Sequence, residues 1–211
     1  MATVGYLMQK PTALLSNKEQ KMAIKPVELE KFYRLINHGP TTMISAKVEG
    51  IENVMSAAWV CAVDYLPKAK LMIIIDKAAY TRKLIEKSGY FAVQIPIAEQ
   101  AKLVVEMGLS RKENPDKLDK LRLFYQADFD IPLVEGCAAW IICKVIPEPE
   151  NHEKHDMFIG EVLAAWADDR IFNKGHWQFD DAPDELKTLH YIAGGQFYQI
   201  GKGVNVTSGE E

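Results

Sequence analysis

Two long runs of strand-like residues, 134–146 and 156–167, constrain the fold of this chain more than any other feature. They contain the sequences CAAWIICKVI and DMFIGEVLAAWA, which are rich in aliphatic and aromatic residues. Between them lies PEPENHEKH, which is too polar and too interrupted by proline to pair as a strand. We therefore expect two long strands joined by an exposed loop.

Shorter strand and helix patterns fill the rest of the chain. Further strands are expected at 41–48, 59–63, 70–75, 90–95 and the C-terminus, and helices at 26–36, 81–89, 97–107 and 183–189. Thr81 is expected to cap the second helix and Gly89 to close it. Strands predominate and no regular β-α-β alternation occurs. The order of elements therefore favours a mainly β fold, an antiparallel barrel with helices at its ends.

The composition suits one globular domain over residues 1–211. Of its 211 residues 48% are apolar and 26% are charged, so the chain can bury a sizeable core. We expect an N-terminal extension and helix over 1–36, and an exposed helical excursion over 108–122, which is the most polar part. The basic groups Lys68/Lys70 and Arg111/Lys112 are interpreted as solvated surface.

The charge and hydropathy of the chain exclude several classes of partner. A net charge of −4 argues against a nucleic-acid partner. No apolar run approaches the ~20 residues that a membrane-spanning helix needs, and the N-terminus lacks an apolar signal core. We expect a cytoplasmic protein without a membrane partner.

The cysteines fit the same compartment. Cys61, Cys137 and Cys143 lie in apolar, strand-like stretches without a C-x-x-C pair, which favours reduced, buried thiols. A catalytic role for Cys61 stays open.

The stretch 52–63, ENVMSAAWVCAV, begins with unusually small side chains for a segment that leads into an apolar strand. Ser56, Ala57 and Ala58 would let a planar ligand lie against the main chain, and Asn53 offers both a donor and an acceptor. The alternative is close packing on a helix or on a second copy of the chain. Trp59 is expected to begin a core strand.

The junction 76–83, DKAAYTRK, is a second candidate site, because an apolar strand ends there and a helix begins. Free amides of the first turn, the Thr81 hydroxyl, and Arg82 or Lys83 could bind a phosphate. The alternative is an ordinary helix start with two solvated cations.

Other motifs indicate little chemistry. His152, His155 and Asp156 resemble a metal cluster in composition, but they lack a second ligand group, and we expect no metal site. The chain also lacks a dinucleotide-binding glycine motif, a phosphate-binding P-loop and a hydrolase G-x-S-x-G elbow.

In order along the chain, five segments resemble the flavin reductase-like family of FMN-binding split barrels, in particular its flavoredoxin-type branch. They are HGPTTMISAKVEG, N-x-M-S-A-A-W, Y-T-R-K-L-I-x-x-S-G-Y-F-A-V, H-x-x-F-I-G-E-V and G-G-x-F-Y-x-I-G, which cover most of residues 38–201. The resemblance implies a six-stranded antiparallel Greek-key barrel, a homodimer and one FMN per subunit.

The resemblance also implies roles for individual residues. It places the flavin along the segment of Asn53, Met55, Ser56, Ala57, Ala58, Trp59 and Cys61, and the phosphate near Tyr80, Thr81, and Arg82 or Lys83. It places His155 on the side where a nicotinamide or substrate would enter. Such a protein would take electrons from NADH or NADPH and pass them to an acceptor that the sequence does not identify. The alternatives are an FMN electron carrier without nicotinamide activity and a flavin-free binding module of the same fold.

Overall fold

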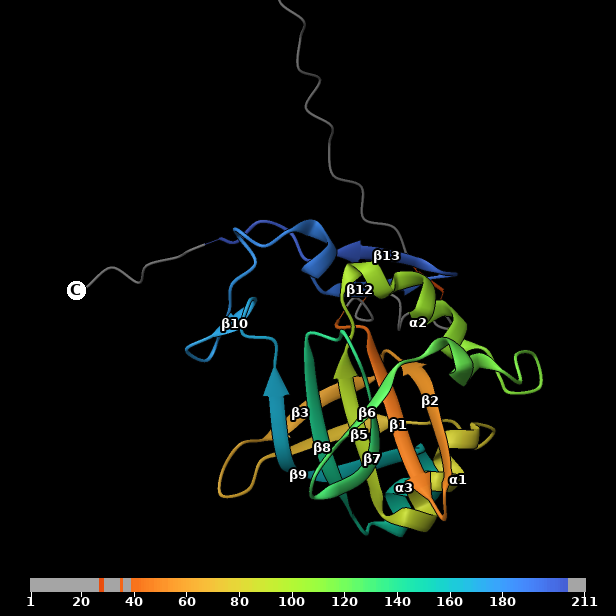
Figure 1. Ribbon diagram of the computed structural model, residues 1–211. Coiled ribbons are helices and arrows are strands. Elements are labelled where there is room, and N and C mark those ends of the chain that lie inside the picture. The colour runs from red at the N-terminus through yellow and green to blue at the C-terminus, as the bar shows by residue number, and fades with distance from the viewer. Residues whose placement is uncertain (1–26, 29–34, 36–38, 205–211) are drawn as a thin grey trace, which may run out of the picture.

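The computed structural model describes residues 27–28, 35 and 39–204, and within them the chain forms an antiparallel main sheet with three small two-stranded sheets (Figure 1). The order of the seven main strands is β2-β1-β5-β8-β9-β4-β3, and neighbouring strands run antiparallel. These strands are β1 (Thr42–Val48), β2 (Ile51–Ala57), β3 (Val60–Asp64), β4 (Lys70–Ile74), β5 (Tyr90–Ile95), β8 (Ala139–Ile146) and β9 (Met157–Ala167). The predicted mainly β, antiparallel architecture is confirmed. The expected helix at 26–36 lies largely outside the described residues.

The sheet has seven strands where six were expected, because the stretch 52–63 forms two strands. β2 and β3 stand at opposite ends of the strand order, yet only Ala58 and Trp59 separate them in the chain. The Trp59 carbonyl accepts a hydrogen bond from the Ile74 amide at 3.1 Å, which fixes the start of β3 beside β4. The segment of small residues therefore forms the corner at which the two ends of the sheet approach each other.

The structure corrects the expected burial of residues 59–63, the apolar part of the stretch 52–63. Trp59 is 49% exposed, and Cys61, Ala62 and Val63 are exposed as well. β3 pairs only with β4 among the described strands, so its outer edge and one face are uncovered in the single chain. Cys61 is thus not the buried thiol that the sequence suggested.

The interior of the barrel is closely packed around Gly160 of β9. A Cβ atom there would lie 2.6 Å from Cζ of Phe91 and 2.8 Å from Cβ of Cys143, so only glycine fits without rearrangement. Burial raises the pKa of the Cys143 thiol to about 12 and also raises that of Cys137. These two thiols are held in the neutral form, as predicted for buried cysteines.

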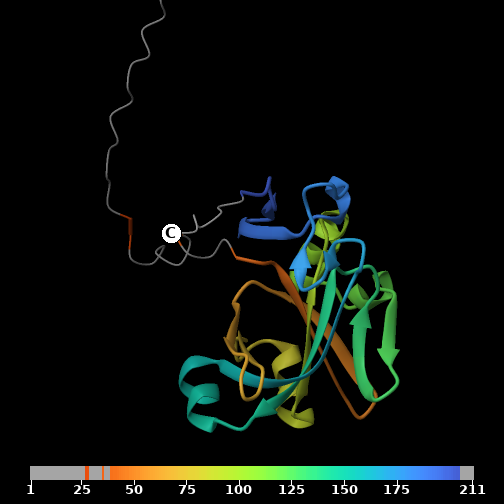
Figure 2. The ribbon, with the colours of Figure 1, turned by 90° about the vertical axis from the view of Figure 1, so that its left-hand side faces the viewer.

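Helices cover the two ends of the barrel. α2 (Ala101–Gly108), preceded by the 3₁₀ turn η2 (Ala98–Gln100), lies at one end with the hairpin of β12 (Leu189–Ala193) and β13 (Gln196–Gln199). At the opposite end lie α1 (Tyr80–Ser88) and α3 (Pro149–His155) (Figures 1 and 2). No described helix is long and apolar enough to cross a membrane.

Three helix predictions need correction. The N-cap residue of α1 is Ala79, and no described side chain forms a capping hydrogen bond, so Thr81 lies inside the first turn. Gly89 closes the helix at φ 72°, as expected. The PEPENHEKH segment contains α3 rather than a loop, because Pro149 fits a first-turn position and polar residues suit an exposed helix. The helix expected at 183–189 is only the 3₁₀ turn η4 (Asp184–Leu186).

The excursion over 108–122 is mostly exposed, as predicted, but it is less helical and it contains a buried lysine. Its one regular element is η3 (Lys117–Lys120), and Lys117 is only 2% exposed. Lys117 Nζ donates to the carbonyls of Met107 at 3.0 Å and Leu109 at 2.9 Å, which ties the segment to the end of α2. Burial, together with the charge of Arg111, lowers the pKa of Lys117 to about 8.

The remaining strands are short. The hairpin of β6 (Leu123–Gln126) and β7 (Phe129–Val134) forms a separate layer on the outside of the barrel (Figure 2), and β10 (Phe172–Asn173) pairs with β11 (His176–Trp177). β7 ends at Val134 and β8 begins at Ala139, because a turn with Gly136 at φ 82° intervenes. The single strand expected over 134–146 is therefore divided.

Candidate functional site

The candidate site lies along β2, whose side chains alternate between two environments. Met55 and Ala57 pack with the barrel interior, on the side of α1. Val54 packs with Met107 on the side of α2, and the Ser56 hydroxyl donates to the carbonyl of Val104. Because side chains alternate along a strand, Asn53 belongs to the α1 side. The two faces of β2 therefore adjoin two different helices.

A polar cluster lies at the start of β2, where α1 begins. Asn53 is 2% exposed, and its Nδ2 donates to Oγ1 of Thr81 at 2.7 Å. Arg111 reaches the same amide from the excursion: its Nε donates to Asn53 Oδ1 at 3.1 Å and its Nη2 to the Glu52 carbonyl at 2.8 Å. We call Asn53, Thr81 and Arg111 the β2 polar cluster.

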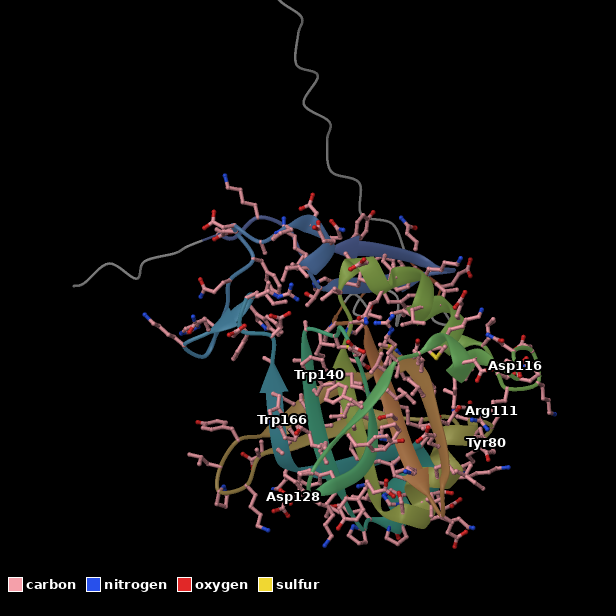
Figure 3. The ribbon with its side chains drawn as sticks, viewed as in Figure 1. Tyr80, Arg111, Asp116, Asp128, Trp140 and Trp166 are labelled. Atoms are coloured by element: carbon pink, nitrogen blue, oxygen red, sulfur yellow. The ribbon has the colours of Figure 1, made fainter. Side chains whose placement is uncertain are left out.

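Tyr80 completes the surroundings of Arg111. The Arg111 guanidinium carbon lies 5.1 Å from the centre of the Tyr80 ring, and Figure 3 shows the two side chains beside each other. Arg111 is half-buried, whereas the neighbouring Lys112 is exposed. The interpretation of both as solvated surface is therefore wrong for Arg111. No local pattern marks it, because the residue that it contacts is 58 positions away.

Arg82, a predicted phosphate ligand, has other partners in this structure. It is buried; its Nε donates to Glu86 at 2.7 Å, and it also forms an ion pair with Asp156. Its other donors bind the carbonyls of Ile75 at 3.0 Å and His152 at 2.7 Å. Arg82 therefore joins α1 to α3 and to the end of β4. Lys83 is exposed beside it on α1.

Two cavities adjoin the small residues at the end of β2. The β2–β4 cavity, of about 370 Å³, is lined by residues 55–59 with Ile74, Asp76, Asp156 and Tyr191. The α2 cavity, of about 360 Å³, lies on the side of Val104 and also contacts Ser56, Ala57 and Ala58. Residues 56–58 thus line both cavities.

The other predicted residues lie around the β2–β4 cavity without lining it. Cys61 is exposed on β3. His155 is exposed at the end of α3, and the adjacent Asp156, at φ 54°, lines the cavity. The structure therefore places the β2 polar cluster at the start of β2 and residues 55–59 at its end, and leaves Cys61 and His155 at the margin.

The sequence matches the model of the flavin reductase like domain over residues 34–197, which is most of the chain. The protein belongs to the flavin reductase-like family. This confirms the resemblance seen in the five sequence segments.

Relatives agree with this assignment. The chain is 38% identical to protein YddH of Escherichia coli K12 over 184 residues, 85% of this chain and 96% of the relative. It is 50% identical to the FMN-binding domain of a flavin reductases-like enzyme from Shewanella baltica, with a TM-score of 0.77 over 86% of this chain and 96% of that one. Flavoredoxin from Methanosarcina acetivorans, 22% identical with a TM-score of 0.63 over 81% of this chain and 89% of that one, shares the fold.

Proposed function

We propose that this flavin reductase-like protein is an FMN-dependent oxidoreductase that takes electrons from NADH or NADPH and passes them to an acceptor. The observation that carries the proposal is the arrangement along β2. A cation and two hydrogen-bonding side chains converge at its start, and small residues that line a cavity lie at its end. FMN has the matching chemistry, since it joins a charged phosphate to a planar ring. The FMN-binding Shewanella baltica protein supports the proposal.

The β2 polar cluster has the donors and the positive charge that a phosphate site needs. A phosphate monoester carries a charge of about −1.5 to −2 and needs several donors with at least one cation. Arg111 supplies the cation, and its current acceptors, the Asn53 amide and the Glu52 carbonyl, are neutral. Thr81 supplies a hydroxyl in the first turn of α1, where no side chain caps the helix. We therefore assign Asn53, Thr81 and Arg111 to the phosphate, with Tyr80 and Lys83 beside it.

The small residues at the end of β2 fit a ring. Ser56, Ala57 and Ala58 place no large side chain in the β2–β4 cavity, and Met55 and Trp59 add apolar contact there. FMN, when bound, supplies the two-electron chemistry, so the residues need only orient it and limit the access of water.

The spectrum of the purified protein tests this function. We expect a yellow protein that releases FMN on heating and whose visible absorption is bleached by NADH or NADPH without oxygen. Bound FMN that neither nucleotide bleaches would instead identify an electron carrier. A colourless protein that fails to bind added FMN would contradict both functions.

His155 is proposed to place the nicotinamide rather than to hold FMN. It is exposed at the end of α3, next to Asp156 of the β2–β4 cavity. His155→Ala should slow flavin reduction by NAD(P)H and leave FMN affinity within a few-fold, as measured by stopped-flow absorbance and fluorescence titration. The neighbouring exposed Lys154→Ala is the control. An equal loss of FMN affinity in His155→Ala would show that the residue belongs to the cofactor site.

We also propose a homodimer formed through the hairpin of β3 and β4. Its exposed apolar side chains are unusually many for a solvent-facing edge: Trp59 at 49%, Val63 at 47%, Tyr65 at 82% and Leu66 at 66% exposed. A second copy of the chain would cover this surface and the open edge of β3. We expect sedimentation at micromolar concentration to give about twice the 23.8 kDa mass of one chain. Tyr65→Glu should shift the protein toward monomer, and an unchanged dimer would place the interface elsewhere.

A further inference from the structure

We propose that the α2 cavity is a second ligand site, for a neutral molecule of one or two rings that carries one hydroxyl or carbonyl group. Its volume of about 360 Å³ lies in the usual range of small-molecule sites, ~300–1,000 Å³. Apolar side chains from α2 and aromatic rings from the C-terminal hairpin form its walls. The residues that matter most are Thr41, Ser56, Val104, Leu109, Tyr191 and Phe197.

The polar feature of this cavity is the Thr41 hydroxyl. Thr41 is 2% exposed, and its Oγ1 is buried without a hydrogen-bond partner in the part of the chain that the structure describes. Neighbouring hydroxyls are paired: Thr42 donates to the Ala57 carbonyl at 2.7 Å and Ser56 donates to the Val104 carbonyl. Buried hydroxyls are normally hydrogen-bonded, so an unpaired one in a cavity wall indicates where a ligand oxygen would bind.

The lining of the cavity indicates a neutral ligand. None of the described residues that line it carries a charge. A nicotinamide dinucleotide or a phosphorylated flavin would therefore leave its phosphates without a cation there. Tyr191 and Phe197, whose ring centres are 5.5 Å apart, offer contact to an aromatic or other flat molecule.

The cavity adjoins the place proposed for the flavin ring and differs from it in most of its lining. It opens on the α2 face of β2, with Val104, whereas Met55 and the β2–β4 cavity lie on the α1 face. Both cavities share Ser56, Ala57, Ala58 and Tyr191, so a ligand in one would lie next to a ligand in the other. Exposed Val105 and Leu109, at 44% and 40%, border the cavity on the side of α2.

The test compares 2-naphthol with naphthalene, which differ by one hydroxyl, in equilibrium dialysis against the full-length protein with and without FMN. A neutral hydrogen bond contributes about 0.5–1.5 kcal/mol, so 2-naphthol should bind about 2- to 13-fold more tightly. Thr41→Val keeps the shape of the side chain and removes the hydroxyl. The Thr41→Val variant should bring the ratio of the two affinities near one. The melting temperature of this variant should not fall, because the hydroxyl that it removes forms no hydrogen bond with the described residues.

A second variant tests the location. Gly108 lines the cavity, and a Cβ there meets nothing within 4 Å, so Gly108→Leu should fill the space and weaken both probes at least tenfold. Gly201→Leu is the matched control, because Gly201 also has open space around it and lies outside this cavity. Equal affinity for the two probes in the unchanged protein, or undiminished binding in Gly108→Leu, would overturn the proposal. Because the experiment is also run without FMN, its failure does not depend on the proposed function.

Discussion

Replacing Arg111 by alanine is expected to weaken FMN binding by roughly 10- to 150-fold and to leave riboflavin binding nearly unchanged. The size of this loss in affinity follows from one charge-assisted hydrogen bond to the phosphate, which contributes about 1.5–3 kcal/mol. Riboflavin has the same ring and ribityl chain without the phosphate. It therefore measures any general damage that the substitution causes to β2. Fluorescence quenching titrations of both flavins give the two affinities.

Two variants make this result specific. Lys112→Ala removes a cation of the same excursion that is exposed, and it should leave the preference for FMN unchanged. Arg111→Lys keeps the charge but not the planar fork that contacts both Asn53 and Glu52, so it should recover only part of the affinity. If Arg111→Ala weakens riboflavin as much as FMN, Arg111 shapes the site and does not bind the phosphate.

Replacing Arg82 by alanine should instead lower the free energy of unfolding, by about 3 kcal/mol. The Arg82 side chain is 3% exposed, and the substitution leaves the carbonyls of Ile75 and His152 without their donor. It also removes the positive charge facing Glu86 and Asp156, whose side chains are 42% and 33% exposed. Because water reaches these carboxylates, we place the effect at the lower end of the values for buried ion pairs.

Urea denaturation measures this effect, with Lys83→Ala as the control from the same turn of α1. Lys83 is exposed, so its replacement should change stability by no more than about 0.5 kcal/mol. The ratio of FMN to riboflavin affinity should stay the same in folded Arg82→Ala. A selective loss of FMN affinity in Arg82→Ala would show that Arg82 binds the phosphate, as the sequence suggested.

The contrast between these two arginines shows why the phosphate site could be predicted only in part. The helix start with its hydroxyl was visible in the sequence, and Thr81 does contact Asn53. Arg82 was the cation nearest to Thr81 in the sequence. In a helix, however, the side chains of consecutive residues point in different directions, so Arg82 does not point where Thr81 does. In the structure Arg82 contacts α3, and the cation at Asn53 comes from a polar segment 58 residues downstream.

The sequence by itself determined the features that depend only on a residue and its neighbours in the chain. Alternating and continuously apolar runs predicted the strands, and Gly89 predicted the end of α1. Each depends on the residue and its immediate neighbours, because side-chain alternation along a strand and left-handed helix ends are local properties.

The tertiary structure decided which distant segments meet and which apolar faces are covered. An apolar run such as residues 59–63 looks the same in sequence whether the same chain or another molecule covers it. Only the strand order shows that β3 is an edge with exposed Trp59. The same holds for Arg111 and Lys117, since a charged residue in a polar segment becomes buried only where the folded chain supplies acceptors, here Asn53 and the carbonyls at the end of α2.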